Sequence, residues 1–126
     1  MQSLAFELLA SPDLTLESAQ KIQILHLLAF ATGSRGMAGG QSIDLASTNV
    51  ALSRIALENM HQHKTGALMR AALLSGAYCA HAVDPDKINA LTRYITAIGL
   101  AFQVVDAILD VEADPATLGK TSGKDA

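Results

Sequence analysis

The chain has 126 residues and a formal net charge of −3, so it is long enough for one compact domain. It has no excess of basic residues, which argues against nucleic acid as a partner. Half of the residues are hydrophobic, only 4% are aromatic and there are three prolines, a composition typical of helices packed on helices. We therefore expect an all-α helical bundle of about five helices.

The sequence also predicts the compartment. The single cysteine, Cys79, excludes an internal disulfide and fits a reducing environment. The start, MQSLAFELLA, lacks the positive region and cleavage site of a signal peptide. Charged residues and histidine interrupt every apolar stretch before it reaches the roughly 20 residues of a membrane span. We expect a cytoplasmic protein without membrane insertion.

The first two helices are separated by a turn. A short apolar helix is predicted over residues 3–10, and it stops at Ser11-Pro12-Asp13, a turn sequence. A second helix is predicted from about Leu16 to Phe30, with apolar residues on two faces. Such a helix should be buried on most sides.

Glycines at positions 33, 36, 39 and 40 follow this helix. Each glycine inside a helix costs about 0.5–1 kcal/mol relative to alanine. Either the helix therefore breaks here, or another backbone or a ligand approaches closely.

Three further helices are predicted in the second half of the chain. The polar run Ser47-Thr48-Asn49 precedes the first, Thr65-Gly66 separates the first from the second, and Asp84-Pro85 is a capping pair before the last. The predicted ranges are 50–63, 67–80 and 86–111, and a polar loop follows Pro115.

Three polar residues form a stripe on the otherwise apolar last helix. Gln103, Asp106 and Asp110 are three and four residues apart, so they share one helical face. Two carboxylates without histidine or cysteine partners favour magnesium, which needs only one or two carboxylates together with substrate phosphate. The alternative is an ordinary solvated helix face.

Basic residues suited to phosphate occur in two places. Lys120 and Lys124 lie in a glycine-bearing loop just after the acidic stripe. Lys64-Thr65 is expected at a helix N-terminus, where free N–H groups favour an anion. Each lysine alone could be a solvated surface charge, but the combination with the acidic stripe suits a metal-bridged diphosphate.

The remaining polar residues are less informative. His61 and His63 are two apart and diverge on a helix, so they do not predict a metal pair. Cys79 lies among small apolar residues and is expected to pack in the core. Asp44 follows Gln41 by three residues, which fits a helix-surface pair and a site role equally well.

Four ordered motifs resemble those of the trans-isoprenyl diphosphate synthases, and especially their bacterial farnesyl-type members. They are GGQSIDL (39–45), HQHKTGALMRAALLSGA (61–77), GLAFQVVDAILDV (99–111) and TLGKTSGKD (117–125). The resemblance implies an isoprenoid-synthase fold around a deep apolar cavity, usually in a homodimer. It also implies magnesium-dependent, head-to-tail joining of isopentenyl diphosphate to an allylic diphosphate (dimethylallyl or geranyl).

The resemblance assigns the charged residues to metal and diphosphate. Asp106 and Asp110 fall in the second aspartate-rich motif, and Asp106 would be the main magnesium ligand. Lys64 and Lys120 would contact the allylic diphosphate, and Lys124 would also lie at the substrate.

The resemblance assigns the other residues to the substrate cavity. Thr65 and Gln103 would lie beside the reacting carbon and steady the cation. Gln41 and Asp44 would belong to a helix that faces the cavity, and Phe102 would form its wall near isopentenyl diphosphate.

The sequence departs from the family pattern in two ways. Ala107 stands where the family has the middle aspartate of its second motif, and Val105 is apolar where a polar residue is common. The first aspartate-rich motif and the C-terminal helices of the family have no counterpart in residues 1–126. We therefore expect a single partial domain, matching the middle-to-C-terminal part of a longer synthase, which does not transfer prenyl groups alone.

Two alternative functions stay open. The chain could be a shortened, non-catalytic paralogue that binds and modulates a full-length synthase, and Ala107 favours that interpretation. It could also be a relative of the terpene cyclases, which share the fold, although its HKTG and TLGK motifs fit prenyl transfer better.

Overall fold

The computed structural model describes residues 1–112, and these residues form helices without any strand. The predicted all-α class is confirmed. The described part has six α-helices and one π-helical turn, η1, one α-helix more than expected. They are α1 (Gln2–Ala10), α2 (Ser18–Thr32), α3 (Met37–Ala46), α4 (Arg54–His61), η1 (Gln62–Gly66), α5 (Ala67–Ala77) and α6 (Pro85–Glu112).

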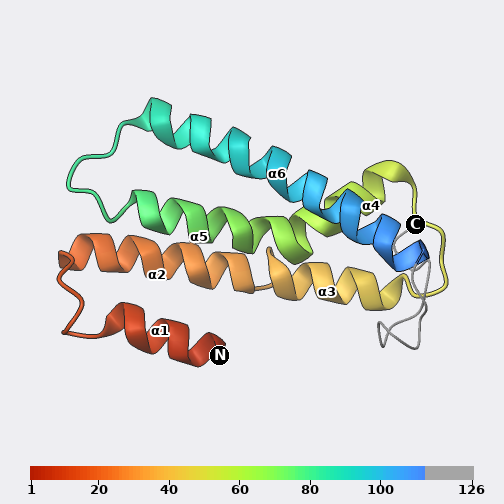
Figure 1. Ribbon diagram of the computed structural model, residues 1–126. Helices are drawn as coiled ribbons and strands as arrows, with labels where there is room; N and C mark the ends of the chain where they lie inside the picture. Colours follow the sequence, from red (N-terminus) through yellow and green to blue (C-terminus); the bar gives the residue numbers. More distant parts are fainter. Residues whose placement is uncertain (113–126) are drawn as a thin grey trace.

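The helices form a stack of antiparallel rods (Figure 1). Helices α2 and α3 lie end to end, and α4, η1 and α5 form a second rod that runs back beside them. Helix α1 packs on α2, and α6 packs on α5 and η1. Because η1 contacts both α3 and α6, the middle of the second rod is where these three elements meet.

Side-chain hydrogen bonds fix where α2 begins. Glu17 and Gln20 form a reciprocal capping box. Helix α2 therefore begins at Ser18, two residues after the predicted start at about Leu16. The Gln20 amide also donates to the carbonyl oxygens of Tyr78 and Ala80, at 3.1 and 3.0 Å. The start of α2 is thereby joined to the end of α5.

The glycine-rich stretch both breaks the helix and allows close approach. Helix α2 ends at Thr32, and α3 begins after Gly36. A Cβ atom on Gly36 would overlap the carbonyl group of Ala31, so the tight connection requires glycine there. Helix α3 was not predicted as a separate helix, because its glycines disfavour one by propensity alone.

The predicted break between the helices over residues 50–63 and 67–80 is wrong. Thr65 and Gly66 lie in the π-helical turn, and Gly66 has helical dihedral angles (φ −59°, ψ −41°). The chain therefore continues from α4 into α5 without a free helix end. One wide turn absorbs the irregularity, as π-bulges do inside α-helices.

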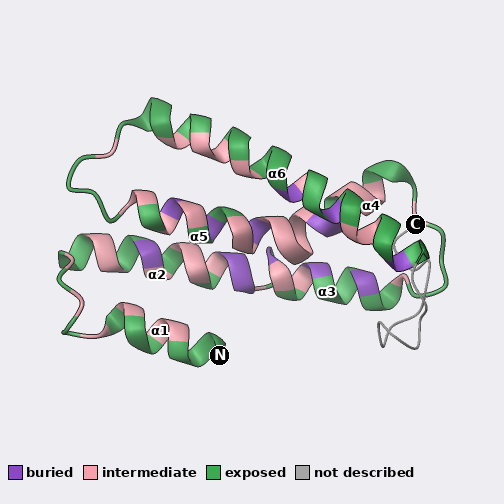
Figure 2. Ribbon diagram, in the orientation of Figure 1, coloured by how far each residue is buried: buried purple, intermediate pink, exposed green. Residues whose placement is uncertain are grey.

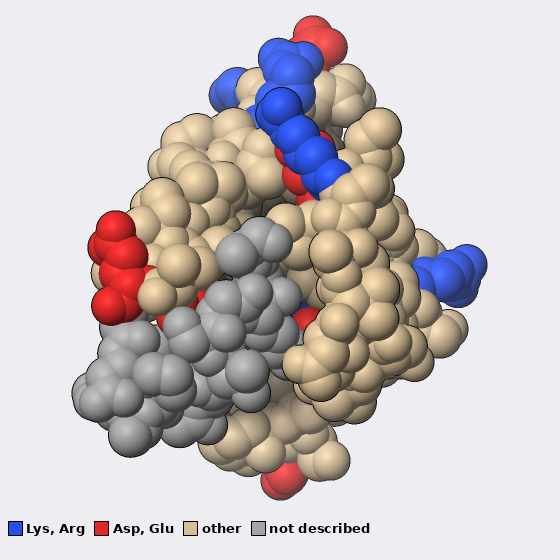
Figure 3. Space-filling model, turned by 90° about the vertical axis from the view of Figure 1, so that its right-hand side faces the viewer, with Lys and Arg blue, Asp and Glu red and all other residues tan. Residues whose placement is uncertain are grey.

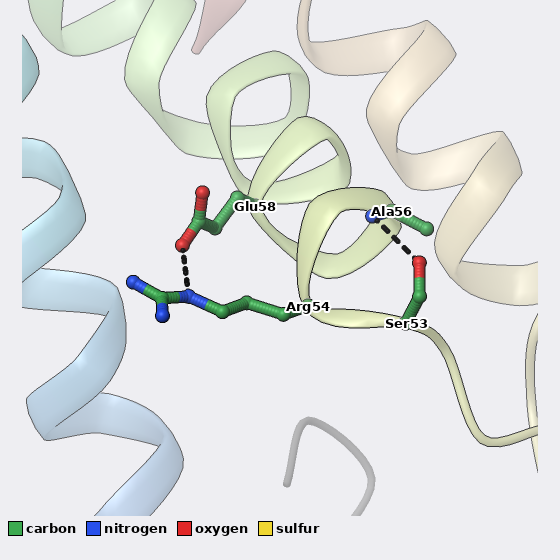
Figure 4. A network of polar contacts seen from close by, with 4 residues as sticks. All are labelled: Ser53, Arg54, Ala56 and Glu58. Atoms are coloured by element: carbon green, nitrogen blue, oxygen red, sulfur yellow. Dashed lines mark hydrogen bonds and ion pairs between the residues drawn. The ribbon is translucent and has the colours of Figure 1, made fainter.

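Helix α4 begins later than predicted, at Arg54. Ser53 is its N-cap, and the Ser53 hydroxyl accepts a hydrogen bond of 3.2 Å from the Ala56 N–H (Figure 4). Arg54 pairs with Glu58 one turn along, at 3.0 Å. Asn49 has a positive φ of 64°, so the chain turns before the cap instead of starting a helix at residue 50.

The buried core is small and lies where the rods touch (Figure 2). Its apolar members are Ile24, Ala31, Met60, Ala67, Ala71 and Leu74. Many large apolar side chains elsewhere in residues 1–112 are exposed, above all on the second half of α6. The described helices therefore cover only part of their own apolar surface.

Helix α6 is capped as predicted: Asp84 Oδ1 accepts from the Asp86 N–H at 2.9 Å, and Pro85 is the first helical residue. By length and composition α6 is apolar enough to cross a membrane, which corrects the expectation that no stretch qualifies. One such helix is weak evidence for a span, because core helices of water-soluble proteins pass the same test. Helix α6 packs on α5 and η1 along one side, and much of its remaining apolar surface is exposed within residues 1–112.

Candidate metal and diphosphate site

The first part of the site lies where α3 crosses η1. Gly40 faces the backbone of Lys64 so closely that a Cβ atom on Gly40 would overlap it. Asp44 lies one turn further along α3, and its Oδ2 atom is 2.7 Å from the Lys64 ammonium. The Asp44 side chain is 3% exposed and the Lys64 side chain 30% exposed. A buried carboxylate thus holds a lysine whose side chain still reaches solvent.

The expected position of Lys64 and Thr65 at a helix N-terminus is wrong. Both residues lie inside the continuous rod formed by α4, η1 and α5. Their backbone N–H groups are not the free donors of a helix start. An anion at this place would therefore need side-chain donors, because no free helix end is available.

The second part of the site is the polar stripe on α6. Gln103 is 7% exposed and Asp110 only 1%, while Asp106 is half-buried. The stripe therefore faces into the bundle and is not a solvated helix face. A Cβ atom on Gly99 would lie 3.9 Å from the Cα atom of Gly66, so α6 comes close to the backbone of η1 at this glycine.

The donor set suits magnesium only in part. Asp106 and Asp110 offer carboxylate oxygens from one helical face, which is the number that magnesium needs when substrate phosphate supplies further ligands. Within residues 1–112, no three side chains of histidine, cysteine, aspartate or glutamate gather as a complete metal site. These two carboxylates could therefore hold an ion together with a bound diphosphate, and would hold it weakly without one.

An apolar cavity of about 590 Å³ lies between α4 and α6. Gln103 and Ala107 line it from α6, and His61, Glu58 and Arg54 line it from α4. Seen from the end of the molecule, most of the described surface is uncharged, and charged side chains gather mainly toward the top of the view (Figure 3).

Sequence reasoning missed two residues of this region. His61 is 5% exposed and lines the cavity beside Gln103. The sequence could have indicated this, because His61 lies three residues before Lys64 and so falls on nearly the same helical face. Gly40 was noted only as one of four glycines, although its contact with Lys64 joins the two helices.

The structure leaves two other predicted site residues away from this junction, and two more lie outside the residues that it describes. Gln41 is exposed on α3, and Phe102 is 55% exposed on α6. Lys120 and Lys124 lie outside the described residues. The roles that the resemblance gives these four residues stay predictions.

Comparison with known proteins agrees with the motifs. The sequence profile of the polyprenyl synthetase family matches residues 1–126. The chain is 46% identical to a farnesyl diphosphate synthase of Haemophilus influenzae and 44% identical to that of Escherichia coli. Each match covers 99% of this chain but 42% of the relative.

Solved structures give the same result for the fold. A geranyltransferase from Helicobacter pylori, complexed with magnesium and isoprenyl diphosphate, superposes with a TM-score of 0.83 at 32% identity. The match covers 97% of this chain and 40% of that one. An FPP/GFPP synthase from Zymomonas mobilis also gives a TM-score of 0.83, at 36% identity, over 96% of this chain and 42% of that one.

Proposed function

Because this chain belongs to the polyprenyl synthetase family, we propose that it forms the diphosphate- and metal-binding part of a prenyltransferase. The reaction joins isopentenyl diphosphate to an allylic diphosphate and releases inorganic diphosphate and a proton. The names of the relatives support a farnesyl-type product. The chain spans about 42% of the length of those relatives, so the proposal concerns its share of the site.

The observation that carries the proposal is the meeting of three elements at η1. Lys64, held by buried Asp44, and the inward-facing stripe of Gln103, Asp106 and Asp110 lie on elements that contact one another. Such an arrangement offers a cation for phosphate oxygens and carboxylates for a metal ion. The lysine cation, and a metal ion held by the carboxylates, would both stabilise negative charge on a leaving diphosphate.

Each residue has a definite task in this proposal. The Lys64 ammonium binds the allylic diphosphate, and Thr65 and Gln103 present a hydroxyl and an amide oxygen to the carbon that becomes positive. Asp106 and Asp110 are the carboxylates that would hold magnesium. When bound, magnesium neutralises charge on the diphosphate and so assists its departure.

The apolar surroundings of these groups have a task as well. The cavity between α4 and α6 is lined largely by aliphatic side chains, which exclude water from a reactive cation. A homodimeric state, which the family motifs suggest, and a cytoplasmic location, which the composition suggests, also belong to the proposal.

Calorimetry with inorganic diphosphate tests this function directly. We expect the 126-residue chain to bind diphosphate in the presence of magnesium. Asp106→Asn should weaken that binding roughly 10-fold or more, because it removes a metal ligand. Asp86→Asn is the matched control, since Asp86 is an exposed aspartate at the opposite end of the same helix.

Two results would speak against the proposal. Equal binding of diphosphate by the wild type and by Asp106→Asn would show that the Asp106 carboxylate is not part of the site. Binding that needs no magnesium would mean that the anion is held by basic side chains alone.

A second candidate function is modulation of a full-length synthase by this chain. Ala107, which lines the cavity where the family pattern has an aspartate, favours it. Mixing the chain with an active farnesyl diphosphate synthase would test it: a change in that enzyme's rate at micromolar chain concentration supports modulation, and an unchanged rate contradicts it.

A further inference from the structure

We propose that Asp44 is a positioning residue, which fixes the ammonium of Lys64 in place for a phosphate oxygen and does not itself touch the substrate. This inference rests on the proposed function, because it assigns a role within the same site. It is more specific than the role that the resemblance gave Asp44, which was a place on a helix that faces the substrate cavity.

The burial of the two side chains separates their tasks. The Asp44 side chain is 3% exposed, and its Oδ2 atom lies 2.7 Å from the Lys64 ammonium. The Lys64 side chain is 30% exposed, so part of it can be reached from solvent. A ligand that approaches this junction therefore meets the lysine and not the carboxylate behind it.

The hydrogen-bonding capacity of the ammonium leaves room for a ligand. A lysine ammonium has three N–H donors. One of them points to Asp44 Oδ2, at 2.7 Å, and the others can point to phosphate oxygens. The four-carbon side chain of a free lysine samples many rotamers, and fixing it beforehand lowers the entropy lost on binding.

The backbone of α3 is shaped for this contact. Gly40 and Asp44 are four residues apart, so they share one helical face, and that face is turned toward η1. Because Gly40 has no side chain, α3 can lie directly against the backbone of Lys64. At that separation the short side chain of Asp44 reaches the end of the long side chain of Lys64.

The sign of one mutational effect tests the inference. Asp44→Asn removes a negative charge next to the ammonium, so simple electrostatics predicts tighter binding of an anion. Positioning predicts the opposite, because an amide holds the ammonium less firmly. We expect Asp44→Asn to weaken binding of magnesium diphosphate roughly 10-fold, as loss of a supporting partner does at metal sites.

A double-mutant cycle with Lys64→Gln shows whether Asp44 acts through the lysine. Lys64→Gln alone should weaken binding, and adding Asp44→Asn to it should cause no further loss. Asp86→Asn serves as the control for a changed net charge. Circular dichroism of each variant checks that its helices are retained.

The possible outcomes separate this inference from the proposed function. Unchanged or tighter binding by Asp44→Asn overturns the positioning role, while the proposed function stands. A wild-type chain that binds no magnesium diphosphate overturns both. If Asp44→Asn does not fold, ¹⁵N relaxation of the Lys64 ammonium in the wild-type chain decides: restricted motion supports positioning, and free rotation of the side chain overturns it.

Discussion

Gly40 and Lys64 are packed backbone against backbone, and this contact joins α3 to η1. It places Asp44, one helical turn further, 2.7 Å from the Lys64 ammonium. The pairing of Asp44 with Lys64 thus depends on the lack of a side chain at Gly40.

Gly40→Ala should destabilise the fold. The added methyl group would overlap the backbone of Lys64, which cannot move as a side-chain end can, and overpacking of this kind costs about 1–3 kcal/mol. Gly76→Ala is the matched control: nothing lies within 4 Å of the added atom, and alanine favours the helix by about 0.5–1 kcal/mol. In urea denaturation followed by circular dichroism, the unfolding midpoint should be lower than wild type for Gly40→Ala and higher for Gly76→Ala.

Ser53→Ala should weaken the start of α4. The Ser53 hydroxyl accepts the Ala56 N–H at 3.2 Å, and loss of such a cap costs about 1 kcal/mol. Ser42→Ala, an exposed serine within α3, is the control and should leave the unfolding midpoint close to that of wild type. Equal midpoints for both variants would show that the cap does not stabilise α4.

Ala107→Asp should alter both magnesium dependence and stability. A third carboxylate next to Asp106 adds a ligand, so half-maximal binding of diphosphate should need less magnesium. The same carboxylate would enter the wall of an apolar cavity and cost roughly 1–3 kcal/mol of stability. Ala107→Asn controls for size without charge; identical magnesium titrations of the two variants would refute the ligand role.

The expected and the observed helices differ where contacts between distant backbone segments determine the helix boundaries. Local sequence was enough to predict α6, its Asp84-Pro85 start and the shared face of its polar stripe. Capping and helical periodicity depend only on neighbours in the chain. The continuity of α4, η1 and α5 could not be read in this way. Thr65-Gly66 disfavours a helix by propensity, and packing of η1 between α3 and α6 overrides that preference.

The same limit applies to the candidate site. The acidic stripe was visible in the sequence because its three residues share one helix face. The pairing of Asp44 with Lys64 joins residues twenty positions apart on different helices, and it depends on how closely α3 approaches η1. Spacing along the chain carries no information on such an approach, so Asp44 could be noted but not paired.

The exposed apolar face of α6 should cause self-association. Val105 and Leu109 lie one turn apart and are 55% and 56% exposed, and contiguous apolar patches of this kind mark interaction surfaces. Val105→Lys with Leu109→Lys should shift sedimentation velocity profiles toward the monomer. Thr96→Lys adds charge to an exposed position of the same helix without removing apolar surface, and should leave the profile unchanged.

The most direct measurement is an amide chemical-shift map of the 126-residue chain, titrated with magnesium and inorganic diphosphate. We expect the largest changes to fall together on the three elements that meet at η1, at Asp44, Lys64, Thr65, Gln103 and Asp106. Changes centred elsewhere, for example on the hollow beside Arg35 and Arg70, would contradict the proposed site, because the anion would then bind away from the acidic stripe.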